Sequence, residues 1–195
     1  GANLIDGFNG LLTINLIIIN VILTYINLNN SNLEFSIVLI AQIIILLTFL
    51  LFNFPNAKIF LGDSGAYLAG ALVALNTIIS NNLNPYISSF FFCTLLFYLF
   101  FEVLFSFIRK VIQNKSPVYP DNMHLHMLTY YKIVPKFGKN SSNFINSIII
   151  NIIYLFLILP GFYFQENPTV SRLWFFALLL IYTIIYSRLY RLTKN

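Results

Sequence analysis

The chain has 195 residues, of which 58% are hydrophobic and only 9% are charged, and its mean hydropathy is +0.81. Because a soluble globular domain has about 25% charged residues, this composition excludes an ordinary soluble domain and predicts residence in a lipid bilayer. The net charge of +5 does not indicate a nucleic-acid partner, since the basic residues follow the predicted sides of a membrane.

Six apolar segments are candidate transmembrane helices. In chain order they are residues 11–28, 35–52, 66–80, 87–108, 144–164 and 173–189. One crossing of a ~30 Å hydrocarbon core needs ~20 helical residues, and long runs without strict alternation argue against a membrane β-barrel. The third segment is short, and Pro160–Gly161 is expected to kink or end the fifth. We predict an all-α, polytopic membrane bundle of about six helices, forming one domain over residues 1–195 with loops at about 53–65 and 109–143.

The basic residues gather on one predicted side of the membrane. Ten of the eleven lie in residues 53–65, in residues 109–143 or in the tail from Arg188, and only Arg172 lies in an opposite loop. The positive-inside rule places the side with ten in the cytoplasm. We therefore expect a multi-pass protein of a bacterial-type cytoplasmic membrane.

Three polar clusters interrupt the apolar sequence. The first cluster is residues 3–10 (NLIDGFNG), the second is residues 60–65 (FLGDSG) and the third is residues 120–127 (PDNMHLHM). Two predicted helices separate each cluster from the next, so all three should face the same side of the membrane. They contain three of the six acidic residues and both histidines. This shared face predicts an active site.

In the first cluster, Asp6 is followed by Gly7 and, two residues later, by Asn9–Gly10. The glycines permit close approach of the backbone to a ligand, and Asn9 can both donate and accept a hydrogen bond, which suits a nucleobase or a sugar hydroxyl. The alternative is a helix cap with turn glycines at the mouth of a membrane helix.

In the second cluster, Gly62 and Gly65 flank Asp63 and Ser64. A carboxylate and a hydroxyl on such a turn suit Mg²⁺, which often shares its ligands with substrate phosphates. The helix N-terminus that follows favours negative charge. Upstream, Lys58 could meet a diphosphate and Phe60 offers a flat apolar face. Alternatively, the turn is a simple cap, with Lys58 and Phe60 as interfacial anchors.

The third cluster brings Asp121, His124 and His126 within six residues. Histidines two apart share a side in an extended chain, so both could meet one phosphate or one metal. The pair alone is weak evidence for a metal site, and loop histidines also occur without a function. The nearby Arg109–Lys110 pair and Lys115 could instead serve an anionic lipid surface.

Taken together, these motifs resemble those of the polyprenyl-phosphate N-acetylhexosamine-1-phosphate transferases (glycosyl transferase family 4). The superfamily includes the translocase that makes the first lipid intermediate of peptidoglycan. The similarity extends from Gly1 to about Tyr131, and the last two segments match only as hydrophobic helices. Family motif positions are matched by Asn3, Asp6, Gly7, Asn53, Phe60, Gly62, Asp63, Gly65, Pro117, Asp121, His124 and His126. The chain departs from the family at Ala66 and Met127, and Leu125 argues against the peptidoglycan branch, which commonly has adjacent histidines.

The resemblance implies transfer of an N-acetylhexosamine-1-phosphate from a UDP-sugar to polyprenyl phosphate, with release of UMP, for cell-wall or surface-polysaccharide synthesis. It implies Mg²⁺ (or Mn²⁺) held by Asp63, and catalytic roles for Asp6, Asp63, His124 and His126. The substrate-binding positions that it implies are Asn3, Gly7, Phe8, Asn9, Asn53, Lys58, Phe60 and Asp121. A homodimer is left open as the assembly.

The family also carries an Asp-Asp-x-x-Asp motif, and the chain has no adjacent acidic pair. We therefore expect the sequence to be the C-terminal portion of a larger transferase. Two other classes stay open. One is a cation transporter or channel, for which the mid-membrane acid Glu102 is the best feature, and the other is a non-catalytic membrane paralogue.

Overall fold

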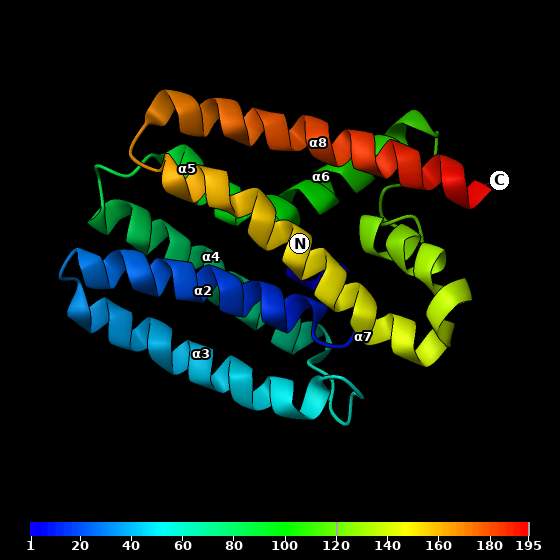
Figure 1. The fold of residues 1–195 in the computed structure, drawn as a ribbon, viewed down its shortest axis with the longest axis horizontal. Coiled ribbons are helices and arrows are strands. Elements are labelled where there is room, and N and C mark those ends of the chain that lie inside the picture. Colours follow the sequence, from blue (N-terminus) through cyan, green and yellow to red (C-terminus); the bar gives the residue numbers. More distant parts are fainter. Residues whose placement is uncertain (120, 195) are drawn as a thin grey trace.

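The computed structural model describes residues 1–119 and 121–194, so Pro120 of the third cluster lies outside the described part. Every element among these residues is a helix (Figure 1). In chain order they are α1 (Ala2–Ile5), α2 (Leu11–Asn29), α3 (Leu33–Asn53), α4 (Gly62–Leu83), α5 (Ser89–Leu95), α6 (Phe97–Ile112), α7 (Leu125–Tyr163) and α8 (Pro168–Lys194).

Five of these helices are long and apolar enough to cross a membrane, and the bent pair α5–α6 makes a sixth candidate. The predicted polytopic membrane bundle is therefore confirmed. Only 17% of the most apolar stretch of α3 is buried within the protein. Its side chains Ile37, Ile45 and Leu51, for example, are exposed. Exposed apolar surface of this extent suits contact with lipid.

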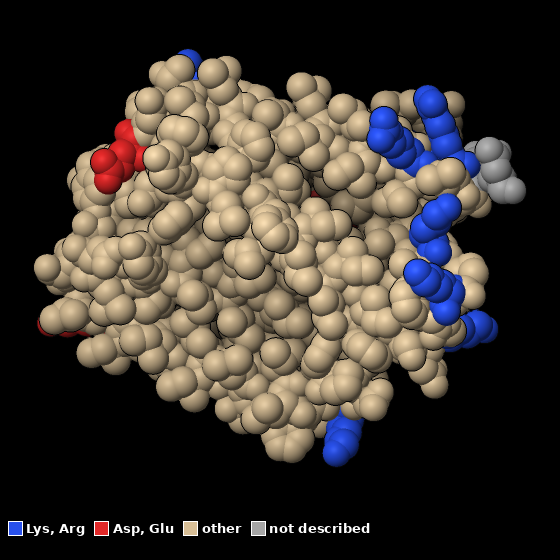
Figure 2. Space-filling view, in the orientation of Figure 1, with Lys and Arg blue, Asp and Glu red and all other residues tan. Residues whose placement is uncertain are grey.

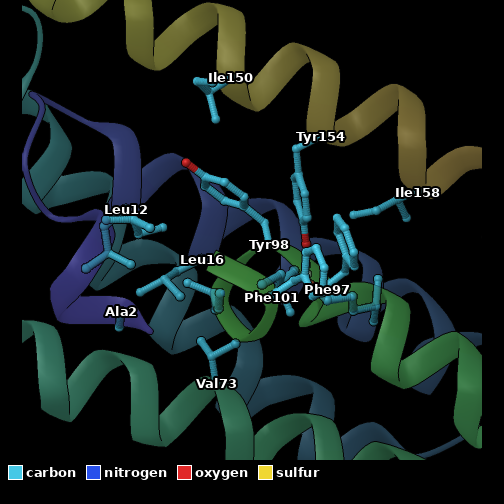
Figure 3. Close-up of a cluster of buried hydrophobic side chains, with 14 of the residues drawn as sticks. Ala2, Leu12, Leu16, Val73, Phe97, Tyr98, Phe101, Ile150, Tyr154 and Ile158 are labelled. Carbon is cyan, nitrogen blue, oxygen red and sulfur yellow. Dashed lines mark hydrogen bonds between the residues drawn. The ribbon is translucent and has the colours of Figure 1, made fainter. Parts of the chain in front are cut away.

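The core lies around α2, which packs against α3, α4 and α7 (Figure 1). Leu12 and Leu16 of α2 are fully buried, and the close-up in Figure 3 shows them near Val73 of α4 and Tyr98 of α6. Polar side chains also join the helices within the membrane: Asn76 Nδ2 donates to Asn20 Oδ1 at 3.1 Å. Such amide contacts hold membrane helices together where apolar burial supplies little net attraction.

Two helices differ from the predicted segments in ways that shape the site. The expected span 87–108 is broken after Leu95, and α5 and α6 meet at a bend of 73°. The helix α7 begins at Leu125 and continues through a kink at Gly138 (φ 73°) to Tyr163, so most of the predicted loop 109–143 is helical. Pro160 lies inside α7 and neither ends it early nor marks its kink.

The third predicted segment is longer than expected, because α4 begins at Gly62 and has 22 residues. The second cluster therefore forms the first turn of a full-length helix. Figure 2 shows most Lys and Arg side chains at the end of the bundle where the C-terminus lies, whereas the acidic side chains at the surface of this view lie at the opposite end.

Candidate active site

Two asparagines join the first cluster to the loop that leads into the second. The Asn53 side chain accepts a hydrogen bond from the Gly10 backbone N–H through Oδ1 at 2.7 Å and donates through Nδ2 to the Ile59 carbonyl at 2.9 Å. Asn9 Nδ2 donates to the Pro55 carbonyl at 2.8 Å. Gly10 has a φ of 78°, a left-handed conformation that glycine adopts without strain. The two clusters are thus held side by side, and both ends of the Asn53 amide are bonded within the protein.

Asp6 and Asp63 are the acidic residues of this joined region. Asp6 follows the last residue of α1, and Asp63 is exposed in the first turn of α4, next to Gly62. Partial burial, and then the negative charge of Asp63, raise the pKa of Asp6 to about 6. The two carboxylates are therefore close enough to repel each other, while the N-terminus of α4 favours the negative charge of Asp63.

The donor set fits a magnesium ion that shares its ligands with a substrate. Mg²⁺ is commonly bound by one or two carboxylates together with substrate phosphates, and a cation between Asp6 and Asp63 would relieve their repulsion. Among the described residues, no group of three or more His, Cys, Asp or Glu side chains is arranged to hold a metal. Asp6 and Asp63 could supply two carboxylate ligands, and substrate phosphates could supply further ones.

The predicted nucleotide-binding residues differ in accessibility. Phe60 is 77% exposed, and Lys58 and Gly7 are also exposed. Phe8 is buried, with its ring edge-on to His126 at 5.8 Å between centroids and near Tyr130 at 5.0 Å. The Phe8 side chain therefore packs within the protein, whereas Phe60 is free to stack on a base.

Asn3 is part-buried and lies beside the second cluster. Its Nδ2 donates to the Tyr67 hydroxyl on α4 at 3.2 Å. This contact adds a third tie between the first two clusters, after those made by Asn9 and Asn53.

Asp121 of the third cluster pairs with a buried arginine. Arg109 Nη2 lies 2.9 Å from Asp121 Oδ2. Burial of Asp121 would raise its pKa, but the Met123 N–H and the Arg109 guanidinium outweigh burial and hold the pKa below its usual value. Lys110 is also buried and donates to the Tyr119 carbonyl at 2.6 Å. Arg109 and Lys110 thus brace this loop and do not face lipid headgroups, whereas Lys115 is exposed.

Both histidines are buried and lie parallel. Their ring centroids are 5.4 Å apart, with 9° between the ring planes. His124 Nδ1 is 3.0 Å from Glu102 Oε1, and His126 Nδ1 is 3.2 Å from the Tyr98 hydroxyl. Since His126 also contacts Phe8, the third cluster lies against the first. The three clusters therefore share one end of the bundle.

The hydropathy pattern did not assign Glu102, Arg109, Tyr98 and Tyr182 to this site. Glu102 is 1% exposed and is bonded to the third cluster, so the feature that favoured a transporter belongs to the same polar region as the histidines. The signal in the sequence was the spacing. Glu102 and Arg109 are seven residues apart, which places two charged residues on one face of a mostly apolar helix.

Comparison with known proteins gives three related findings. The family model described as glycosyl transferase family 4 matches residues 1–81. An undecaprenyl-phosphate alpha-N-acetylglucosaminyl 1-phosphate transferase from Thermotoga maritima is 32% identical over 132 residues, which are 67% of this chain and 39% of the relative. A phospho-N-acetylmuramoyl-pentapeptide-transferase from Leuconostoc mesenteroides is 44% identical over 79 residues, which are 40% of this chain and 24% of that relative.

A decaprenyl-phosphate N-acetylglucosaminephosphotransferase from Mycobacterium leprae is also similar, at 33% identity over 95 residues, covering 41% of this chain and 23% of the relative. The chain thus spans between about a quarter and two fifths of the length of these relatives. No solved structure matches the chain significantly.

Proposed function

Because the chain belongs to the superfamily of polyprenyl-phosphate N-acetylhexosamine-1-phosphate transferases, we propose that the protein transfers an N-acetylhexosamine-1-phosphate from a UDP-sugar to polyprenyl phosphate. UMP is the second product. The names of two relatives include undecaprenyl phosphate and decaprenyl phosphate, which supports a polyprenyl phosphate as the acceptor. The UDP-sugar donor is inferred from the resemblance of the sequence motifs to the family. The acceptor lipid would reach the site from the bilayer that surrounds the helices.

The juxtaposition of Asp6 and Asp63 is the observation that carries this proposal. Two turns from separate parts of the chain, each with a glycine beside an aspartate, meet at one end of the bundle, and one carboxylate raises the pKa of the other. Phosphoryl transfer depends mainly on positioning and on neutralising charge. Two neighbouring carboxylates, one of them in the exposed first turn of α4, support this chemistry.

In the reaction, an oxygen of polyprenyl phosphate forms a bond to the β-phosphorus of the UDP-sugar, and the bond from that phosphorus to the bridging oxygen of UMP breaks. Asp63, with Asp6 beside it, would hold Mg²⁺ (or Mn²⁺), which supplies positive charge to the diphosphate oxygens. Lys58 would add a further cation, and Phe60 would stack on the uracil ring. His124 and His126 would donate hydrogen bonds to a diphosphate oxygen of the bound substrate.

The site faces the cytoplasm in this proposal, where UDP-sugars would be supplied. Most of the basic residues lie at the end of the bundle where the C-terminus lies (Figure 2). The third cluster lies at the same end, where the Tyr186 hydroxyl donates to the Met123 carbonyl (Figure 1). The positive-inside rule assigns this end to the cytoplasm. The bacterial relatives support placement in the inner membrane. A transporter is not favoured, because Glu102 is bonded to three groups of the protein.

The test is release of UMP by the complete protein in lipid nanodiscs, supplied with polyprenyl phosphate, Mg²⁺ and a panel of UDP-sugars. We expect acceptor-dependent UMP release with at least one UDP-N-acetylhexosamine, and loss of turnover by about a hundredfold or more in Asp63→Asn. Glu34→Gln is the matched control, because Glu34 is an exposed acid in the first turn of α3. Turnover of Asp63→Asn equal to that of the control would exclude Asp63 from the reaction.

A further inference from the structure

Glu102 lies on α6, in a segment that the family motifs do not cover, and it is 1% exposed. A buried carboxylate is costly unless its oxygens are bonded. Here both oxygens are bonded, and the partners come from two other helices. Glu102 of α6 is therefore bonded directly to residues of the third cluster.

Three groups of the protein converge on the Glu102 carboxylate. Oε1 lies 3.0 Å from His124 Nδ1 and accepts from the Leu125 backbone N–H at 3.1 Å. Oε2 accepts from the Tyr182 hydroxyl of α8 at 2.6 Å. An ionised carboxylate only accepts hydrogen bonds, so its natural partner at Nδ1 is a ring nitrogen that carries a proton.

The second ring nitrogen of His124 is placed differently. Nε2 lies 3.6 Å from Asp121 Oδ1, which is too long for a hydrogen bond. His124 precedes α7 as its N-terminal capping residue, with extended backbone angles (φ −80°, ψ 154°). Its ring is therefore held on the Nδ1 side by Glu102 of α6, which Tyr182 of α8 bonds in turn, and Nε2 is directed toward the loop that carries Asp121.

We propose that Glu102, braced by Tyr182, is a positioning residue that keeps a proton on Nδ1 of His124. Nε2 is then the nitrogen that faces the substrate, and it donates to a diphosphate oxygen once the ring has taken up its second proton. The inference rests on the proposed transferase function, because the substrate in question is the sugar-nucleotide diphosphate. A carboxylate that orients a histidine in this way fixes its tautomer and stabilises the protonated ring. The helix α8 thereby becomes part of the site, although the family motifs end before it.

His126 provides an internal comparison. Its Nδ1 faces the Tyr98 hydroxyl at 3.2 Å, a group that can either donate or accept, so no single tautomer is imposed on it. The two rings lie parallel but have different partners at Nδ1. The ionisable groups in contact with or next to the His124 ring are Glu102, Asp121 and His126. Arg109 pairs with Asp121, and Tyr182 bonds Glu102.

The test is ¹⁵N nuclear magnetic resonance of the complete protein in nanodiscs with ¹⁵N-labelled histidine, in which the signals that disappear in His124→Asn are those of His124. We expect the neutral His124 ring to carry its proton on Nδ1 in the wild type and in Tyr98→Phe, which alters only the partner of His126. Glu102→Leu should lose this preference. Glu102→Gln keeps an acceptor for Nδ1 and should retain it, so this variant serves if Glu102→Leu fails to fold.

Turnover supplies the second readout. Glu102→Gln should lower kcat by about tenfold or more with KM for the UDP-sugar changed by less than about threefold, because the charge opposite the ring is lost while the binding surface is kept. A proton on Nε2 in the wild type, or tautomer and kcat unchanged in both Glu102 variants, would overturn the proposal. An inactive wild type with the proton on Nδ1 would instead contradict only the proposed function.

Discussion

The Gly10 backbone N–H donates to Asn53 Oδ1 at 2.7 Å, across 43 residues of sequence. Both groups lie in buried residues. This bond fixes the position of the first cluster relative to the loop before α4. It makes Asn53 a structural link between Asp6 and Asp63, in addition to any contact with substrate.

Asn53→Ala should therefore weaken both stability and activity. The buried Gly10 N–H loses its acceptor, and an unsatisfied buried donor costs about 1–3 kcal/mol. We expect a lower melting temperature in nanodiscs and a lower kcat, since the two carboxylates are no longer held together. Asn30→Ala is the control. Asn30 caps α2 at the opposite end, where its Nδ2 bonds the Ile26 carbonyl at 2.7 Å, so this variant should lose some stability but retain its kcat. Equal kcat for the two variants would contradict the linking role.

Asp121→Asn should destabilise the protein, because the buried Arg109 loses its ionic partner. Removing one partner of a mostly buried pair costs about 2–4 kcal/mol. The same substitution at Asp63 should leave stability unchanged or raise it, since it relieves repulsion with Asp6. Thermal melting of the two variants at neutral pH compares these effects. A melting temperature equally low in both would show that loss of the Arg109 pair is not the cause.

The pH dependence of stability checks the same pair. The folded-state pKa of Asp121 is lowered, so its contribution is complete above the unfolded value of about 4 and is lost as pH falls through the lower folded value. Wild-type protein should lose this stability in acid, and Asp121→Asn should lack that part of the loss.

The sequence patterns predicted the parts of the site that short motifs define. The turns around Asp6 and Asp63 lie at the same end of the bundle because an even number of helices separates them, and hydropathy alone located those helices. By contrast, the hydropathy pattern predicts a loop at the start of α7, because Lys132, Lys136 and Lys139 lower the hydropathy there. A helix that is not fully embedded in the hydrocarbon core does not need an apolar run.

Contacts between distant helices could not be predicted from the pattern. Tyr182 and Glu102 are 80 residues apart, and nothing local to either residue indicates the bond. The break between α5 and α6 also lacks a proline or glycine signal, yet it sets the direction of α6 and with it the positions of Glu102 and Arg109. Asn53 shows a further limit. Its motif position predicts contact with the substrate, but the sequence does not indicate its bonds to Gly10 and Ile59.

Divalent-cation binding should depend on pH in the range where Asp6 titrates. Because burial and the charge of Asp63 raise the pKa of Asp6 to about 6, protonated Asp6 is a poor ligand below that value. Affinity for Mn²⁺, followed by electron paramagnetic resonance, should rise between about pH 5 and about pH 7 and then level off. Asp6→Asn should bind more weakly, without this pH-dependent rise. An affinity of the wild type that stays constant over this range would contradict the joint site.

The fate of the β-phosphate of the donor tests the central claim most directly. The complete protein is supplied with polyprenyl phosphate, Mg²⁺ and a UDP-N-acetylhexosamine labelled with ³²P at the β-phosphorus and with ³H in uracil. Phosphosugar transfer predicts that ³²P enters the lipid phase in an amount equal to the ³H-labelled UMP left in water, and that both signals are lost in Asp63→Asn. Labelled UDP in water together with a lipid that carries sugar but no ³²P, or no acceptor-dependent release with any UDP-sugar, would contradict it.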